Sequence, residues 1–161
     1  MKPRLSFHGG VGTVTGSRFL VETDHTCIQV DAGLFQGLKK LRLMNWEGPA
    51  FDPVSVEHLI LTHAHIDHSG YLPRLVKLGY SSPVYCTPAT QHLANLMLLD
   101  AAKIQEEEAT YANKKGFSKH EPALPLYTSE DARRAIGLLR PVEYEDWVDL
   151  GHDVGFRFLN A

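Results

Sequence analysis

Residues 62–70 combine the side chains that hold catalytic metals in proteins. Three imidazoles (His63, His65 and His68) and the carboxylate of Asp67 lie close together in this segment. Imidazole nitrogens and a carboxylate oxygen are ligands that suit zinc or a similar divalent cation. Four such side chains are more than one open catalytic site uses, so the pattern favours two metal ions. The sequence therefore predicts a site for two divalent metal ions in this segment.

A buried strand and a helix are expected to position these side chains. Residues 58–61 form a short apolar run typical of a buried strand, and the apolar residues of 71–78 recur at helical spacing. The four candidates therefore lie on the loop between the end of a strand and the start of a helix. The two earlier histidines point to the same side of an extended segment, whereas Asp67 and His68 begin the turn.

The pattern His-x-His-x-Asp-His after an apolar strand resembles the signature of the metallo-β-lactamase-fold hydrolases. Three longer segments resemble the β-CASP branch, the RNA-processing nucleases that include ribonuclease J: residues 12–17, 30–37 and 61–75. The resemblance covers essentially the whole chain. It implies an α/β fold, here the amino-terminal half of the metallo-β-lactamase αβ/βα sandwich, with a mixed sheet and flanking helices.

The resemblance also implies a role for each candidate residue. His63 and His65 would hold the first of two divalent ions, and Asp67 and His68 the second, with Zn²⁺ expected and Mn²⁺ as the alternative. Asp67 could also orient or deprotonate the attacking water. Asp31, at the end of its strand, would support the metal-bearing loop from behind. An ordinary Asp-x-Gly turn is the alternative interpretation of that residue.

The ligand count predicts that residues 1–161 are a single but incomplete metallo-β-lactamase domain. The family pattern places a further histidine after a strand like 154–159, and the sequence ends at Asn160-Ala161. Four ligands shared by two cations leave about two for each, whereas a catalytic zinc usually has three. The chain alone is therefore expected to be inactive. Its sheet is expected to need a carboxy-terminal half or a partner chain as cover.

Composition is that of a globular protein rather than a disordered one, with 43% hydrophobic and 22% charged residues. No apolar run approaches the ~18 residues needed to cross a bilayer, and no signal segment is expected. Cys27 and Cys86 lie in apolar runs and are interpreted as buried thiols in the cytoplasm. The net charge of −3 argues against a broad basic surface but does not exclude a nuclease, with RNA as the expected substrate of the complete enzyme.

The remaining elements are expected from periodicity and end signals. Predicted strands are 5–8, 18–22, 26–30, 83–86 and 154–159, and predicted helices run from Thr87 or Thr90 to Lys115 and from Thr128 to Leu139. Residues 34–53 and 118–125 are expected to be loops, and Glu106–Glu108 to be solvated. One face of the long helix is expected to pack in the core rather than to bind a cofactor, namely Leu93, Leu96, Met97, Asp100 and Ile104.

Two other functions use the same ligands. One is a thioesterase or glyoxalase-like hydrolase of the same fold acting on a small molecule. The other is a non-catalytic module that keeps a partial metal site. The glycines of residues 9–16 do not indicate a nucleotide P-loop, because no Gly-Lys-Ser/Thr ending follows. His8, His25, His92, His120 and His152 are not expected to be ligands.

Overall fold

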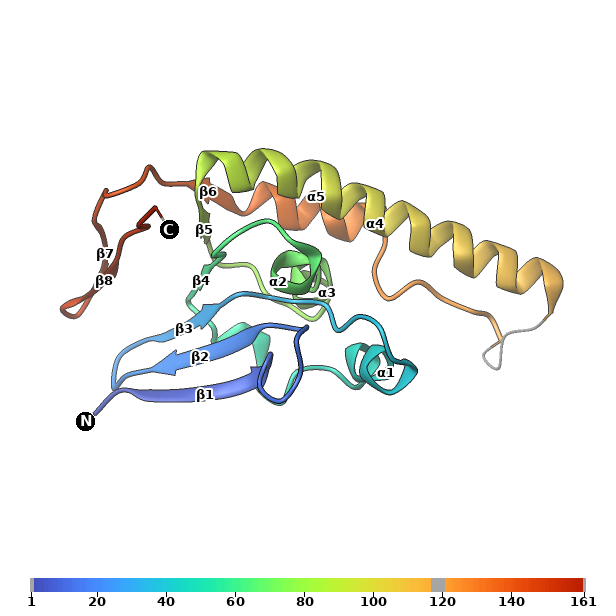
Figure 1. Ribbon diagram of the computed structural model, residues 1–161, viewed down its shortest axis with the longest axis horizontal. Coiled ribbons are helices and arrows are strands. Elements are labelled where there is room, and N and C mark those ends of the chain that lie inside the picture. The colour runs from blue at the N-terminus through green and yellow to red at the C-terminus, as the bar shows by residue number, and fades with distance from the viewer. Residues whose placement is uncertain (1, 117–120, 161) are drawn as a thin grey trace.

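The computed structural model describes residues 2–116 and 121–160 (Figure 1). Its main sheet has six strands in sequential order, namely β1 (Arg4–Gly9), β2 (Arg18–Glu22), β3 (Cys27–Val30), β4 (His58–Ile60), β5 (Val84–Cys86) and β6 (Leu139–Pro141). The first three strands pair antiparallel, and β3 to β6 pair parallel. This mixed sheet with helices confirms the predicted fold class.

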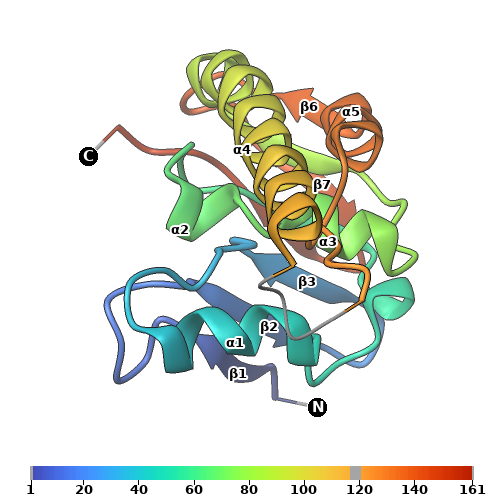
Figure 2. The same ribbon diagram turned by 90° about the vertical axis from the view of Figure 1, so that its right-hand side faces the viewer.

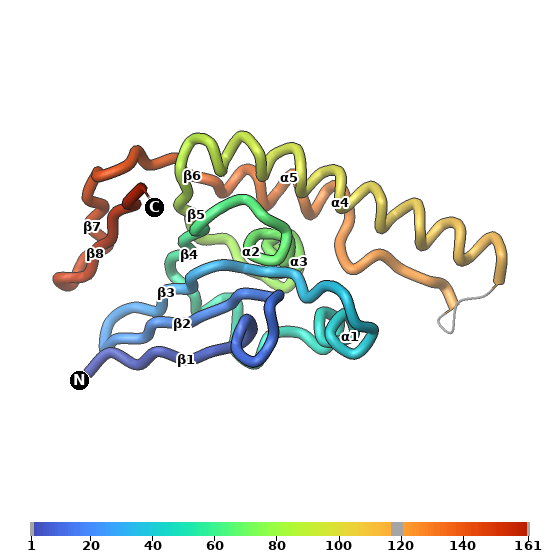
Figure 3. Tube along the Cα trace, in the orientation of Figure 1, coloured from blue at the N-terminus to red at the C-terminus, as the bar shows by residue number. Residues whose placement is uncertain are grey.

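The helices and a separate hairpin complete the described chain. They are α1 (Lys39–Glu47), α2 (Ile66–Ser69), α3 (Leu72–Lys77), α4 (Pro88–Lys115), α5 (Ser129–Gly137), a 3₁₀ turn η1 (Pro53–Ser55), and the antiparallel strands β7 (Val148–Gly151) and β8 (Val154–Phe156). The loop from β1 to β2 lies at the same end of the sheet as α1 (Figure 3). None of the helices in the described residues is long and apolar enough to cross a bilayer.

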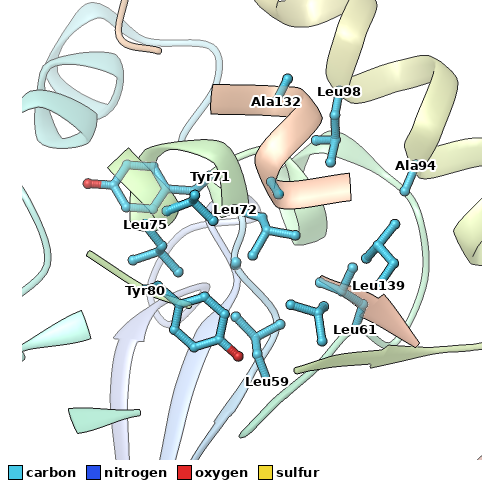
Figure 4. Packing of buried hydrophobic residues seen from close by; sticks show 14 of the residues in the cluster. Leu59, Leu61, Tyr71, Leu72, Leu75, Tyr80, Ala94, Leu98, Ala132 and Leu139 are labelled. Atoms are coloured by element: carbon cyan, nitrogen blue, oxygen red, sulfur yellow. The ribbon is translucent and has the colours of Figure 1, made fainter. Parts of the chain in front are cut away.

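The core lies between the sheet and helices α3, α4 and α5 (Figure 4). Leu59 of β4 and Val84 of β5 are direct neighbours across the sheet, and both are fully buried. Leu72 and Leu75 of α3 and Leu98 of α4 pack above them. Burying large aliphatic side chains in this way stabilises the fold by roughly 2 kcal/mol for each.

The opposite sheet face is also apolar, and much of it is exposed. Alternation along the strands places Leu5 and Phe7 on this face, beside Val21 and Phe19 of β2. Leu5 and Phe7 are more than half exposed, and the Phe7 ring meets the Phe19 ring edge to face at 5.6 Å. At the other end of this face, the ring of Phe156 lies 5.3 Å from that of Tyr85.

Helix α4 begins and ends where the sequence predicted, but its packed face was predicted wrongly. The Thr87 side chain accepts a hydrogen bond from the Thr90 amide, and Gly116 ends the helix in the left-handed conformation. The buried positions are Thr90, Ala94, Leu98 and Ala102. Small side chains allow α4 to lie close to α5, which presents Ala132 and Ala135. The expected stripe faces outward instead: Leu93, Leu96 and Ile104 are 49%, 62% and 48% exposed.

Two leucines of α4 provide a matched test of this arrangement. Leu98→Ala is expected to lower the free energy of unfolding by about 2–5 kcal/mol, because it leaves a cavity beneath the helix. Leu96→Ala is expected to change it by about 0.5 kcal/mol or less, because its side chain is mostly in water. Urea denaturation of both variants measures the difference. Equal losses would contradict the observed packing.

Other expectations also need correction. Residues 39–47 of the expected loop form α1, which has no side-chain cap at its start and therefore no recognisable start signal. Leu139 begins β6 rather than ending a helix, and β7 was not predicted. Glu106 is not simply solvated, since it accepts hydrogen bonds from the amide and hydroxyl of Ser129 at 2.8 and 2.6 Å. Part of the expected loop at 118–125 lies outside the described residues.

Candidate metal centre

The four predicted ligands gather between β4 and α3. His63 and His65 precede the short helix α2, whereas Asp67 and His68 lie within it. Nε2 of His63 is 3.2 Å from Nδ1 of His65, and the His63 and His68 ring centroids are 4.0 Å apart. Nε2 of His68 lies 3.7 Å from Oδ2 of Asp67. The structure therefore brings all four side chains into one cluster at the carboxyl ends of the central strands.

Backbone hydrogen bonds fix α2 to the segment that follows β3. The amide of Ala32 donates to the carbonyl of His68 at 2.7 Å, and the amide of Leu34 donates to the carbonyl of Ile66 at 3.0 Å. From the β1–β2 loop, the Ser17 amide donates to the Asp67 carbonyl at 2.9 Å. Gly33 lies between them, where an added Cβ would overlap the carbonyl oxygen of Asp67. Only glycine allows this approach of three segments.

Asp31 lies beneath the cluster and is 2% exposed. Its carboxylate accepts hydrogen bonds from the Thr62 amide at 2.9 Å and from the Ser17 hydroxyl at 3.1 Å. Oδ2 also lies 2.7 Å from Nδ1 of His68. Because a carboxylate is only an acceptor, this contact places the His68 proton on Nδ1 and leaves Nε2 with its lone pair. The backbone of Asp31 is held in the left-handed region, with φ of 59°.

The electrostatic surroundings favour a neutral ring at His63. Partial burial lowers the pKa of His63 below its usual value, and the neighbouring His68 ring lowers it further. A histidine binds a metal through a neutral imidazole. His63 is therefore available as a ligand to lower pH than an exposed histidine.

A buried arginine supports the same region from below. Arg18 is 2% exposed and donates from Nε to the Gly33 carbonyl at 2.8 Å. Its guanidinium lies 3.6 Å from the Tyr71 ring centroid and donates to Asn45 Oδ1 at 3.2 Å. Burial lowers the pKa of Arg18 to about 10. The residue thus links β2, α1 and the glycine that contacts Asp67.

Several members of this arrangement were not predicted from the sequence. Thr62 and Ser17 both donate to Asp31, but neither hydroxyl stood out in the sequence. Arg18 could have been found, because it shares the inward face of β2 with Leu20. His8 does not approach the cluster, since it contacts Ser6 and Phe51. His152 stacks on His25 at 4.6 Å, in the turn where it was expected.

The side chains of His63, His65, Asp67 and His68 are of the chemical types that bind divalent metals. Three imidazoles and a carboxylate are suitable donors, and Asp31 behind His68 is the partner that ligand histidines usually have. The side chains do not surround a common point, however. Among residues 2–116 and 121–160, no three His, Cys, Asp or Glu side chains are arranged to hold one ion together. The His63 and His65 rings contact each other instead.

Comparison with known proteins extends these observations. A model of the "Metallo-beta-lactamase superfamily" matches residues 11–159. Ribonuclease TTHA0252 from Thermus thermophilus is 38% identical over 148 residues, which cover 92% of this chain and 30% of that protein. Transcription termination factor FttA from Methanocaldococcus jannaschii is 30% identical over 158 residues, or 98% of this chain and 23% of that protein. The chain thus spans less than a third of the length of these relatives.

A solved structure shows the same fold. It is that of an archaeal metallo-beta-lactamase superfamily protein from Sulfolobus tokodaii, with a TM-score of 0.51 and 20% sequence identity. The similarity covers 94% of this chain and 53% of that one.

Proposed function

Since the chain belongs to the metallo-beta-lactamase superfamily, we propose that it forms part of the active site of a zinc-dependent ribonuclease of the β-CASP type. The observation that carries the proposal is the cluster of His63, His65, Asp67 and His68, with Asp31 orienting His68. The similarity to a ribonuclease over 92% of the chain supports RNA as the substrate.

The proposed ligands divide into two pairs. His63 and His65 would hold one divalent ion, and Asp67 and His68 the other. When bound, two such ions supply Lewis-acid charge and lower the pKa of a water molecule toward neutrality. Zn²⁺ suits the imidazoles best, and Mn²⁺ is the alternative.

The side chains of the cluster then have separate tasks in hydrolysis of a phosphodiester bond. Asp31 holds His68 by its Nδ1 proton, so that Nε2 keeps a fixed direction. Asp67 is partly exposed, and its carboxylate can orient the attacking water and accept its proton. The leaving oxygen needs a proton from an acid that these four residues do not supply.

We also propose that the active enzyme contains protein beyond residues 1–161. Two ligands for each ion are fewer than a catalytic zinc usually has. The exposed sheet face around Leu5 and Phe7 also needs a cover, either from the same protein or from a partner chain. Cys27 and Cys86 are free thiols, which fits a reducing compartment, and we place the enzyme in the cytoplasm.

Replacing Asp31 by asparagine tests whether the Asp31 carboxylate orients His68 for metal binding. The amide keeps only one acceptor oxygen, so it cannot accept both from the Thr62 amide, which now bonds Oδ1, and from Ser17 and His68, which now contact Oδ2. Affinity for zinc is expected to fall about 10- to 100-fold. Competition with a chromophoric chelator measures this loss, and Asp100→Asn on the exposed side of α4 is the control. Unchanged zinc affinity in Asp31→Asn would contradict the assigned role.

The proposed function is tested by RNA cleavage with Zn²⁺ or Mn²⁺. The 161-residue chain alone is expected to leave a labelled unstructured RNA intact, because its metal sites are incomplete. A longer protein that contains this chain and further ligands is expected to cleave the RNA and to stop when a chelator is added. Robust cleavage by the 161 residues would contradict the incompleteness. Absence of RNA cleavage by the longer, metal-loaded protein would contradict the substrate.

A further inference from the structure

We infer that a groove between α1 and the distal half of α4 binds single-stranded RNA. The inference rests on the proposed RNA substrate and adds a binding surface outside the metal cluster. The groove has a volume of about 520 Å³, within the range of ligand-binding clefts. Its wall includes Trp46 and Arg42 from α1, Gln105 and Glu108 from α4, and Leu124.

The groove lies beside α2, the helix that carries two side chains of the metal cluster. Figure 2 shows α1 below the distal part of α4. Leu34 lines the groove, and its amide donates to the carbonyl of Ile66 in α2 at 3.0 Å. Asn45 lines it as well, and its carbonyl accepts from the Tyr71 hydroxyl just after α2. These contacts place the groove beside α2, the helix that carries Asp67 and His68.

The charge of α1 fits a phosphate backbone. Lys39, Lys40 and Arg42 occupy its first turns and are exposed, although the whole chain has a net charge of −3. Within the described part of the chain, none of these three cations has an ion-pair partner. Cations without a carboxylate partner remain available for phosphate oxygens. Glu108, on the opposite wall, can accept a hydrogen bond from the amino group of a base.

An aromatic side chain beside these cations fits a nucleobase. Trp46 is 49% exposed and lines the groove next to Arg42. Stacking of bases on aromatic rings, together with a basic track for the backbone, is how proteins hold single-stranded nucleic acids. Trp46 and Arg42 line the groove, and Lys39 and Lys40 lie at the start of the same helix. This combination favours a nucleic-acid strand over a protein segment as the occupant.

The test measures binding of a labelled, unstructured 12-nucleotide RNA to the chain in the presence of a chelator. Trp46→Ala is expected to raise the Kd about 5- to 100-fold. The triple variant Lys39→Ala, Lys40→Ala, Arg42→Ala is expected to weaken binding and to lower the slope of log Kd against log salt by about 2. Circular dichroism confirms that each variant is folded.

Matched controls lie on the other side of α4. Tyr111→Ala is the aromatic control, and the double variant Lys103→Ala, Lys114→Ala is the charge control, because these three residues line a different surface of α4. Both variants are expected to leave the Kd nearly unchanged. A second readout uses Trp147→Phe, which leaves Trp46 as the only tryptophan. Binding of RNA in the groove is expected to quench the fluorescence of Trp46.

Each outcome decides the inference separately from the proposed hydrolysis. An unchanged Kd in the α1 variants, or an equal effect in the controls, would overturn the RNA groove and leave the surface to a protein partner. Because binding is measured without metal, a groove that binds RNA stands even if no cleavage is found. If the complete enzyme cleaves RNA but the α1 variants bind RNA with an unchanged Kd, the proposed function stands and the RNA-binding role of the groove is rejected.

Discussion

Asp67→Ala is expected to lower RNA cleavage by the complete, metal-loaded enzyme by about 10²- to 10⁴-fold. The substitution removes one proposed ligand of the second ion and the carboxylate placed to take a proton from the attacking water. Its effect on the fold is expected to be small. The side chain is 28% exposed, and its contact with Nε2 of His68 is long, at 3.7 Å. The free energy of unfolding should therefore change by about 1 kcal/mol or less.

Single-turnover cleavage and urea denaturation of the same samples separate the two effects of Asp67→Ala. Asp100→Ala, an exposed carboxylate on α4, is the control and should change neither quantity. Turnover equal to that of the unaltered enzyme would reject the role of Asp67. Loss of activity together with a large loss of stability would show that Asp67 acts on the fold rather than on the reaction.

Gly33→Ala is expected to be among the most damaging small substitutions in the chain. The new methyl group would overlap the Asp67 carbonyl oxygen and crowd the Ser17 amide, both of which belong to the framework of the metal cluster. Either the β1–β2 loop or α2 must shift, which breaks the hydrogen bond between them. We expect a loss of about 3 kcal/mol or more in the free energy of unfolding. Zinc affinity should fall with it.

Gly137→Ala is the matched control for that substitution. An added Cβ at Gly137, the last residue of α5, meets no atom within 4 Å. The change should leave stability unaltered or raise it by up to about 1 kcal/mol, because alanine favours helix more than glycine does. Urea denaturation and zinc titration of both variants give the comparison. A Gly33→Ala protein as stable as Gly137→Ala, with unaltered zinc affinity, would contradict the close contact of three segments.

Features with a local signal could be predicted from the sequence. Thr87 and Gly116 marked the ends of α4, because a capping side chain and a left-handed residue are needed at those positions whatever packs around them. The gathering of His63, His65, Asp67 and His68 on one loop was indicated by their spacing, whereas metal binding by these side chains stays a prediction. The location of these four residues on the loop between β4 and α3 was predicted from the apolar patterns of the segments on either side.

Features that depend on tertiary contacts could not be predicted. Leu93, Leu96 and Ile104 have the spacing of a packed face, but close approach of α5 selects the alanines on another side of α4. Helix α1 begins without a cap and depends on contacts of Asn45 with Phe35, so periodicity alone did not reveal it. The bonds of Thr62 and Ser17 to Asp31 join segments far apart in the sequence, and no local pattern indicates them.

The most direct test of the account is an anomalous difference map at the zinc edge from crystals of the protein soaked in zinc. Strong peaks are predicted beside His63 and His65 and beside Asp67 and His68, with ligand distances of about 2.0–2.2 Å. Nδ1 of His68 should still be bonded to Asp31 in that structure. A map with no peak at these four side chains, from crystals that contain zinc elsewhere, would contradict the metal centre and the function built on it.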